Sequence, residues 1–537
     1  MRCKMKSLLS AVCLFFFFSE NVYGQGVSLL KDIYVGTGSS GCFYFGAVKN
    51  ALYFTAEDGT HGYELWKTDG TAPGTFMVKD ISLGSRGSEP NGFTYIDSGR
   101  TIFTAISETG NEPWVTDGTT NGTVLLKDII PGNTGSTPSA YVAFKGKVAF
   151  VTQNSTSFAF SELWVSDGTS AGTYLLKSFN SISNFPLSVC GDLIYFSADD
   201  SLHGTEPWIT DGTPSGTHLL KDINPGNKSS GPGGFASYKN KVYFSANDGL
   251  NGNEIWNTDG TAAGTTLFKD IYTGIESSFP ALFLPVGDVL CFSADDGVHG
   301  RELWKADGTP KGTVLVKDIS PGSDGSSIKM GKIINTNAFL FSADDGVHGN
   351  ELWKSDGTEA GTVLLKDIYP GAAGYDFYNS LEVINDIALF GAKDSIHGVE
   401  LWRSNGTAAE TFMFSDISKD SSSFPTSFNR INNRIVFTAS TMEYGTELWS
   451  MDMVSGLFLN HEKNKEIVLS PNPFHDKAFI NTGLSTESHL IIYNLSGKEV
   501  KHLRGNTAID REGLENGMYI FKLVDRGAEG IGKMMVK

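Results

Sequence analysis

The stretch ELWKADGTPKGTVLVKDI at residues 302–319 holds the unit that decides the fold. It joins a Glu-Leu-Trp segment, an Asp-Gly-Thr-x-x-Gly-Thr turn and an apolar run that ends in Lys-Asp-Ile. All nine tryptophans lie 44 to 50 residues apart, each with a Glu two positions before it, and the turn motif is clear in seven copies, altered at Asn405 to Glu410 and lost after Trp449. Self-similarity at a fixed period indicates a repeat architecture. The repeated positions expected to be structural include Glu64, Trp66, Asp69, Trp114, Trp164, Trp208, Trp256, Trp304, Trp353, Trp402 and Trp449.

Each copy contains four short runs rich in Val, Ile, Phe, Tyr and Thr, bounded by Gly, Asp, Asn or Pro. Such runs are typical of strands, and four strands in about 48 residues match one blade of a β-propeller. The run at 51–56 is apolar on both faces, as a sheet stacked between two neighbours requires. We therefore predict an all-β fold, a β-propeller of about nine four-stranded repeats with eight or nine blades.

The two ends of the array indicate how it closes. Residues 27–33, VSLLKDI, form a Lys-Asp-Ile strand with no Trp strand before it, and the array ends at Trp449 with no Lys-Asp-Ile strand after it. We expect the N-terminal strand to complete the last blade, which closes the ring and removes an exposed sheet edge. Eight blades and a stray unit remain an alternative, and two fused rings are disfavoured because no linker interrupts the spacing.

The motif residues favour structural roles. Asp in the turn accepts backbone N–H bonds and Gly adopts positive φ. The tryptophans are expected to pack blade against blade, with a ring of exposed sugar-stacking platforms as the less favoured alternative. The Glu is expected to form an ion pair across the hairpin with the Lys of Lys-Asp-Ile, which is present in eight of nine copies, Ser415 being the exception.

Loops of the form Asp-Asp-Gly-x-His-Gly are the clearest candidates for a ligand. Five of the ten histidines occupy this one repeat position. A turn role is favoured, because the spacing of well-defined calcium loops is absent; a Ca²⁺ site is the minority alternative, since oxygen-rich loops can hold the ion. Its candidate ligands are Asp295, Asp296, Asp344 and Asp345. No other cofactor is expected.

Charge, apolar segments and cysteine spacing limit the classes of partner and the location that we expect. The net charge of −18 repels phosphate backbones, so nucleic acid is not expected as a partner. Residues 1–25 have a basic start and a short apolar core, as a signal peptide does. No later segment has about 18 consecutive apolar residues, so we expect no transmembrane segment in the mature chain. Cys42, Cys190 and Cys291 have no metal-site or disulfide spacing and are expected to be buried thiols.

No catalytic residues can be assigned. The chain has no Gly-x-Ser-x-Gly elbow, His-Glu-x-x-His pair or phosphate loop, and the irregular third unit around 151–160 offers no replacement. The favoured function is a non-enzymatic scaffold for binding or adhesion to a protein or glycan ligand. A propeller enzyme acting on extracellular polysaccharide and a purely structural surface-layer component are the alternatives.

The pattern changes after the array. We predict a propeller over 26–455, a polar linker over 456–466 and a separate domain over 467–537. Alternating strands between Ser-Gly and Asn-Gly turns predict a small Ig-like β-sandwich there.

The chain resembles known families in both of its parts. Residues 26–455 resemble the ELWxxDGT repeat family of secreted and surface proteins of Bacteroidota, a family that implies little about activity. The last domain resembles the C-terminal sorting domain of the type IX secretion system, on the motif residues Pro471, Asn472, Pro473, Gly497, Lys498, Gly517 and Tyr519. That resemblance implies Sec-dependent export, passage through the type IX machinery, and release or attachment to surface lipopolysaccharide. The expected location is extracellular or on the outer-membrane surface.

Overall fold

The computed structural model describes residues 26–96, 99–153, 160–183, 187–372, 374, 380–453, 469–470, 476–480, 488–494, 498–504, 508–525 and 528–537. These residues form strands, turns and loops and contain no helix, so the all-β prediction is confirmed for them. In the same residues no helix is long and apolar enough to cross a membrane. The chain divides into two compact units, Met1–Met453 and Val454–Lys537. The predicted signal peptide and linker lie outside the described residues.

The described strands of the first unit form nine antiparallel sheets. Sheet 1 consists of β2 (Phe43–Val48), β3 (Ala51–Glu57), β4 (Tyr63–Thr68) and β5 (Phe76–Lys79). Sheet 2 consists of β6 (Asn91–Ile96), β7 (Arg100–Ser107), β8 (Gly110–Thr116) and β9 (Val124–Leu125). Sheet 3 consists of β10 (Ser139–Phe144), β11 (Lys147–Gln153), β12 (Ser161–Ser166) and β13 (Tyr174–Phe179). Sheet 4 consists of β14 (Ser181–Ile182), β15 (Ser188–Cys190), β16 (Leu193–Asp199), β17 (Thr205–Thr210) and β18 (His218–Leu219).

The remaining sheets repeat the same order. Sheet 5 consists of β19 (Gly233–Tyr238), β20 (Lys241–Asn247), β21 (Asn253–Thr258) and β22 (Thr266–Lys269). Sheet 6 consists of β23 (Ala281–Val286), β24 (Val289–Asp295), β25 (Arg301–Ala306) and β26 (Val314–Lys317). Sheet 7 consists of β27 (Lys329–Asn335), β28 (Ala338–Asp344), β29 (Asn350–Ser355) and β30 (Val363–Lys366). Sheet 8 consists of β31 (Glu382–Ile384), β32 (Ile387–Asp394), β33 (Gly398–Ser404) and β34 (Phe412–Ser415). Sheet 9 consists of β35 (Thr426–Ile431), β36 (Arg434–Thr441), β37 (Gly445–Asp452) and β1 (Val27–Lys31).

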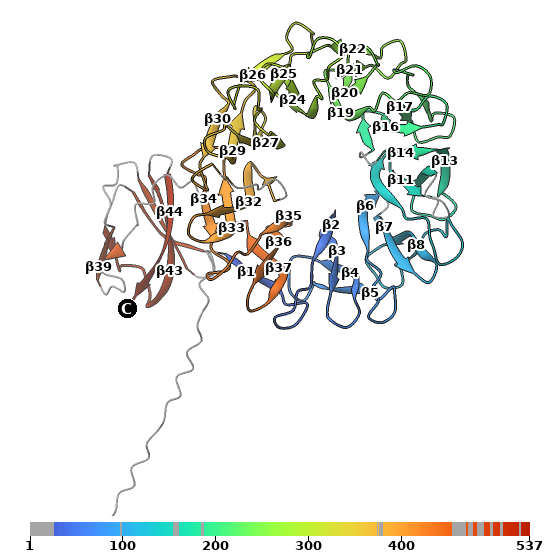
Figure 1. Cartoon of the computed structure of the whole chain (residues 1–537). Coiled ribbons are helices and arrows are strands. Elements are labelled where there is room, and N and C mark those ends of the chain that lie inside the picture. Colours follow the sequence, from blue (N-terminus) through green and yellow to red (C-terminus); the bar gives the residue numbers. More distant parts are fainter. Residues whose placement is uncertain are drawn as a thin grey trace, which may run out of the picture. The chain divides into compact units, whose positions relative to one another are not determined.

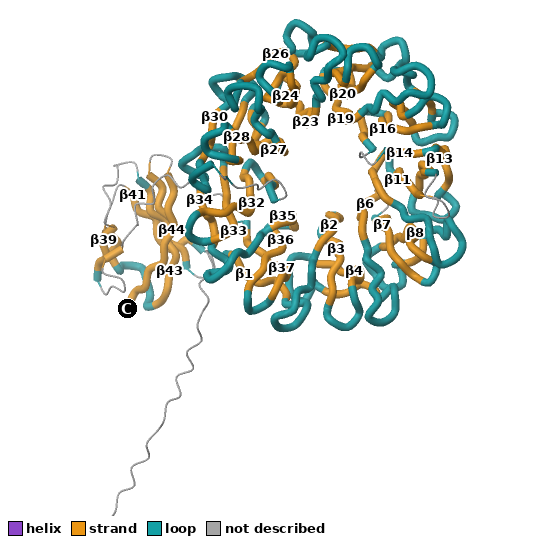
Figure 2. Tube along the Cα trace, viewed as in Figure 1, coloured by secondary structure: helices purple, strands orange, loops and turns teal. Residues whose placement is uncertain are grey.

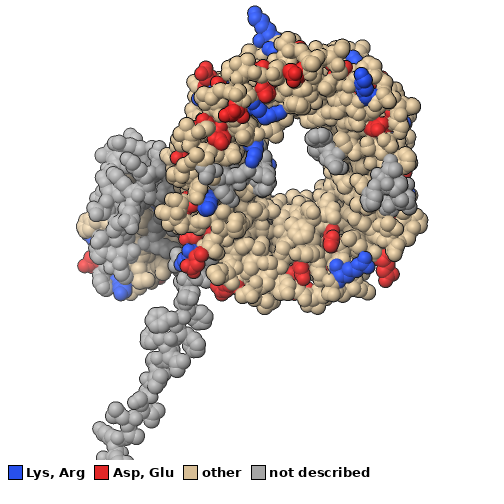
Figure 3. All heavy atoms as spheres, in the orientation of Figure 1, with Lys and Arg blue, Asp and Glu red and all other residues tan. Residues whose placement is uncertain are grey.

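The sheets of the first unit stand around a central opening, with strands such as β2, β6, β19, β27 and β35 on its inner side (Figures 1 and 2). The opening persists when all atoms are drawn (Figure 3). Inner strands of successive sheets are in contact, including β2 of sheet 1 with β35 of sheet 9. Radial antiparallel sheets around an axis form a β-propeller.

Strand β1 closes the ring at the seam between the two ends of the array. It pairs antiparallel with β37, with Val27 opposite Met451 and Ser28 opposite Ser450. Val27 is buried there, so the split repeat at the chain ends is joined in the way the sequence predicts.

The core lies between neighbouring sheets rather than within one. Trp66 of sheet 1 packs in one buried cluster with Leu30, Ile33 and Leu448 of sheet 9 and its extension. The strand VLCFSAD of β24 is buried along nearly its whole length, because both its faces meet neighbours. Burial on both faces explains why these strands lack polar alternation.

The second unit has two sheets that share a core. One contains β38 (Leu469–Ser470), β39 (Lys477–Ile480) and β42 (Ala508–Asp510). The other contains β40 (His489–Tyr493), β41 (Glu499–Arg504), β43 (Gly517–Asp525) and β44 (Ala528–Val536). Ala478 and Ile509 of the first sheet pack with Leu490 and Phe521 of the second.

Candidate functional site

The repeated glutamate is a buried hydrogen-bond acceptor that joins neighbouring segments of the chain. We call the residues that do this the latch glutamates: Glu64, Glu112, Glu206, Glu254, Glu302, Glu351, Glu400 and Glu447. The Glu302 side chain is fully buried, with 0% exposed. Its Oε2 accepts hydrogen bonds from Ile319 N at 3.0 Å and from Ser326 Oγ at 2.7 Å. Its Oε1 accepts a third bond, from Ser320 N at 3.1 Å. The carboxylate therefore ties β25 to the end of β26 and to the loop before β27. The backbone bond from Ile recurs at Glu64, Glu206, Glu254, Glu351 and Glu400.

The last latch crosses the seam of the ring. Glu447 accepts bonds from Ile33 N at 2.9 Å, Tyr34 N at 3.1 Å and Ser40 N at 3.0 Å. Burial raises the pKa of the latch carboxyl groups, to about 7 for Glu351 and Glu400. These raised values have a structural cause, since the side chains are enclosed and already hydrogen-bonded.

The predicted Glu–Lys ion pair is wrong. The Lys of Lys-Asp-Ile instead reaches the next sheet, where Lys317 Nζ donates to Thr362 O at 2.9 Å. The strand register pairs Lys317 with Leu303 and not with Glu302, whose oxygens accept hydrogen bonds from Ile319 N, Ser320 N and Ser326 Oγ. Lys79 also stands over the ring of the next sheet's Trp114, 5.7 Å from its centroid. The same inter-sheet bond is made by Lys79, Lys127, Lys221, Lys269 and Lys366.

The tryptophans pack between sheets. Eight of them are less than 9% exposed, Trp449 being fully buried, so they offer no open stacking platform. Trp164 of the irregular third unit is the half-buried one, and its Nε1 donates to Glu162 at 3.1 Å. Among the described residues, Glu162 makes none of the latch bonds that Glu302 makes.

The Asp-Gly-Thr segments form the turns that the sequence predicts. Asp69 Oδ1 accepts bonds from Thr71 N at 2.9 Å and from Thr71 Oγ1 at 2.7 Å. Gly70 has φ +88°, which favours glycine. A Cβ at Gly74 would lie 2.0 Å from the Asp69 carboxylate, so the second glycine is required by close approach.

The histidine loops are closed by their own hydrogen bonds. Asp296 accepts from Val298 N, from His299 N and from His299 Nδ1 at 2.8 Å, and Asp295 accepts from Gly297 N at 2.7 Å. The pKa of His299 is raised by the hydrogen bond to Asp296. Asp344 and Asp345 behave in the same way in the next copy. Across the described residues, no group of three or more His, Cys, Asp or Glu side chains could hold a metal ion.

The structure also describes the three predicted cysteines and part of the predicted sorting motif. Cys42, Cys190 and Cys291 are buried free thiols. Of the sorting motif, Pro471, Asn472, Pro473 and Gly497 lie outside the described residues. Gly517 begins β43, and buried Tyr519 donates to Glu515 O at 3.0 Å. Lys498 N donates to Asn494 Oδ1 at 2.9 Å, just before β41.

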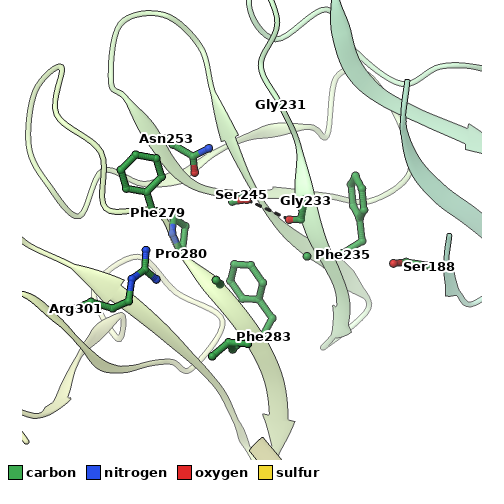
Figure 4. A pocket seen from close by; sticks show the side chains of 13 residues that line it. Ser188, Gly231, Gly233, Phe235, Ser245, Asn253, Phe279, Pro280, Phe283 and Arg301 are labelled. Carbon is green, nitrogen blue, oxygen red and sulfur yellow. Dashed lines mark hydrogen bonds between the residues drawn. The ribbon is translucent and has the colours of Figure 1, made fainter. Parts of the chain in front are cut away.

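A groove of about 600 Å³ lies where the inner strands of sheets 5 and 6 meet. This volume is within the usual range for ligand sites, about 300–1,000 Å³. The groove is lined by Ser188, Gly231, Gly233, Gly234, Phe235, Ser245, Asn253, Phe279, Pro280, Ala281, Leu282, Phe283 and Arg301. Aromatic rings and the Arg301 guanidinium converge on it from different strands (Figure 4).

Arg301 breaks the repeat. It is the residue directly before the latch glutamate, where other copies have Asn, Thr, Tyr, Ser or Val. It is half-buried, and its Nη1 donates to Ser293 Oγ at 3.0 Å. Burial lowers its pKa, an effect that the charge of Asp295 partly offsets. Among the described residues it makes no salt bridge within 4.0 Å.

Phe279 is held at the rim of the groove. Its side chain is 56% exposed, and its backbone has φ +44°. The hydrogen bond from Phe279 N to Asn253 O, at 3.1 Å, fixes this conformation. Equivalent positions hold Gly41, Glu89, Thr137, Gly231, Ser327 and Phe424, all at positive φ. The positive φ therefore belongs to the repeat, and Phe424 is as exposed as Phe279 at the equivalent position, so what distinguishes Phe279 is its place beside Arg301 in the groove.

This groove could not be predicted from any single copy of the repeat. Its residues come from sheets 4, 5 and 6 and are brought together only by sheet packing. One feature of the sequence does point to the groove: among the residues that directly precede the repeated glutamates, Arg301 is the one cation. Two smaller grooves also face the opening, at β2 with β31 and β35 and at β2 with β6 and β10.

Comparison with known proteins identifies the second unit. Residues 469–537 match the family of secretion system C-terminal sorting domains. The type IX sorting domain is thus present, which indicates export to the cell surface or extracellular space and interaction with the type IX machinery. No curated protein matches the chain.

Solved structures resemble the chain in fold only. Puromycin hydrolase is 13% identical with a TM-score of 0.36, over 69% of this chain and 61% of its own, so the chain spans about three fifths of that enzyme. The propeller domain of the Trilobed protease from Pyrococcus furiosus is 11% identical with a TM-score of 0.34, over 61% of this chain and 98% of its own. Prolyl oligopeptidase B from Galerina marginata is 8% identical with a TM-score of 0.40, over 82% of this chain and 56% of its own. At such values no activity is transferred to this chain.

Proposed function

We propose that this protein is a non-enzymatic binding scaffold, a closed nine-bladed propeller that the C-terminal sorting domain delivers to the cell exterior. Its export begins with Sec recognition of residues 1–25, and it ends released or attached to surface lipopolysaccharide. Residues 26–455 form the propeller, and residues 467–537 form an Ig-like sandwich that carries the signal for export. Its ligand is a protein or a glycan.

One observation carries the proposal. The latch glutamates, the buried tryptophans and the Asp-Gly-Thr turns have structural roles, whereas the groove between β19 and β23 combines the exposed Phe279 side chain with Arg301, a cation that no other copy has at that position. The groove lining contains no histidine, cysteine, Asp or Glu, the usual acid–base groups, which favours binding over catalysis.

The test is a binding assay on arrays of glycans and peptides with the exported protein, with and without Ca²⁺. The proposal expects saturable binding without turnover, and loss of binding when groove residues are changed. Turnover of a polysaccharide without stable binding would instead favour the enzyme alternative. Deleting residues 469–537 should leave the protein inside the cell, and continued export would contradict the role of the sorting domain.

A further inference from the structure

We infer that the groove between β19 and β23 binds an acidic glycan, with Arg301 bonded to the carboxylate of a uronic acid and Phe279 stacked on a sugar ring. This inference rests on the proposed function and names the ligand class of its site. Figure 4 shows Arg301 projecting from its strand toward Pro280, with the Phe279 ring beyond it.

The charge of Arg301 calls for an anion. A guanidinium has five N–H donors, and Arg301 makes one described side-chain hydrogen bond, to Ser293 Oγ. Asp295, the cross-strand partner of Arg301, supplies a nearby opposite charge but forms no ion pair with it within 4.0 Å among the described residues, so a bound carboxylate would add the direct contact that the half-buried guanidinium lacks. The planar guanidinium of arginine can donate two parallel hydrogen bonds to one carboxylate. A single cation suits a singly charged group such as a uronate.

The aromatic lining favours a sugar. Phe279 is more than half exposed at the rim, while Phe235 and Phe283 line the wall below it. Open aromatic faces offer flat apolar contact area, which suits the C–H face of a pyranose ring. Gly231 has open space where a Cβ would stand, so a ligand can approach the backbone there, whereas the Phe283 ring packs against Gly234. Ser245 Oγ donates to Gly233 O at 3.2 Å in the same wall.

The same strands are unsuited to a peptide added as a further strand. Such binding needs a row of unpaired backbone groups along a sheet edge. The inner strand β23 has a bulge between Ala281 and Leu284, with Leu282 at φ +59°, and β19 has one between Gly233 and Ala236. Bulges interrupt that row.

The net charge of −18 does not oppose this assignment at short range. Charges beyond about 8 Å are screened at physiological ionic strength, whereas a buried pair is screened much less. Lys and Arg side chains also stand on part of the rim of the central opening (Figure 3).

Calorimetric titration of the full exported chain tests the inference. The probes are short galacturonate oligomers, the same oligomers as methyl esters, a sulfated neutral oligosaccharide and a peptide with a free C-terminal carboxylate. We expect the uronate to bind and the methyl ester, which lacks the charge, to bind at least about 10-fold more weakly.

The variants are chosen from the repeat itself. Arg301→Asn installs the residue found at Asn111, Asn253 and Asn350, and Phe279→Gly installs that of Gly231, so both are expected to fold. Arg301→Asn should weaken uronate binding about 10- to 100-fold. Phe279→Gly should weaken it about 10-fold. The matched controls Arg430→Asn and Phe424→Gly, at other blades, should bind as the wild type does.

Three results would overturn the inference: equal uronate binding by Arg301→Asn, equal binding of the methyl ester, or Arg301-dependent binding of the sulfated sugar or peptide in place of the uronate. In the last case the proposed scaffold function stands and only the ligand class is wrong. If no arrayed ligand binds and a polysaccharide is cleaved, the proposed function itself is wrong.

Discussion

Replacing Glu302 by glutamine should destabilise the propeller by about 2 kcal/mol. Glutamine keeps one acceptor oxygen, which can retain the bonds from Ile319 N and Ser326 Oγ. Its amide nitrogen then faces Ser320 N, so that buried donor loses its acceptor. A hydrogen bond to a charged group contributes about 1.5–3 kcal/mol, and removing a buried charge offsets part of the loss.

Thermal unfolding of the exported chain measures this effect. A loss of about 2 kcal/mol corresponds to a fall in Tm of roughly 4 °C for a large domain. Glu162→Gln is the matched control at the same repeat position, because Glu162 bonds only Trp164 Nε1 and, at 3.5 Å, Ser178 Oγ among described residues. We expect it to cost less than about 1 kcal/mol, and exposed Glu359→Gln within about 0.5 kcal/mol. An unchanged Tm for Glu302→Gln, or an equal loss for Glu162→Gln, would refute the latch.

Closure of the ring, the contacts between sheets and the proton linkage can each be tested separately. Cysteines at the paired positions Ser28 and Ser450 should form a disulfide, seen as a mobility shift on non-reducing gels, and its absence under oxidation would contradict closure by β1. Lys317→Met should cost about 1 kcal/mol in urea unfolding by removing the bond to Thr362 O, whereas no loss would contradict the inter-sheet role. Tm should be higher at about pH 5.5 than at about pH 8, because the latch glutamates and loop histidines have raised pKa values and hold protons more tightly when folded, so their stabilisation is lost as pH rises. A higher Tm at the alkaline pH would show that this proton linkage is wrong.

Much of the fold could be predicted because the same residues recur in every copy of the repeat. The spacing of the tryptophans and the split unit at Val27 and Trp449 predict sheets in series and a shared strand. The turn chemistry of Asp69 and Gly70 follows from local backbone preferences, which sequence shows directly.

The partners of the motif residues were harder to predict. Glu302 and Lys317 have opposite charges and flank one hairpin, yet each bonds elsewhere. The glutamate is enclosed where backbone N–H groups need an acceptor, and the lysine projects past its own sheet. Which groups are left unpaired depends on packing between sheets, and the groove at Arg301 depends on it as well.

The repeated residues stabilise the ring in this protein, and we propose that residues that differ from the repeat pattern contact the ligand. The adjacent residues Arg301 and Glu302 separate these roles, and the most direct test is the binding isotherm of each variant, recorded with its Tm, for the ligand found on the array. We predict that Arg301→Asn loses affinity and keeps its Tm, whereas Glu302→Gln keeps its affinity and loses Tm. Retained affinity in Arg301→Asn, with affinity lost in Glu302→Gln, would contradict this division of roles.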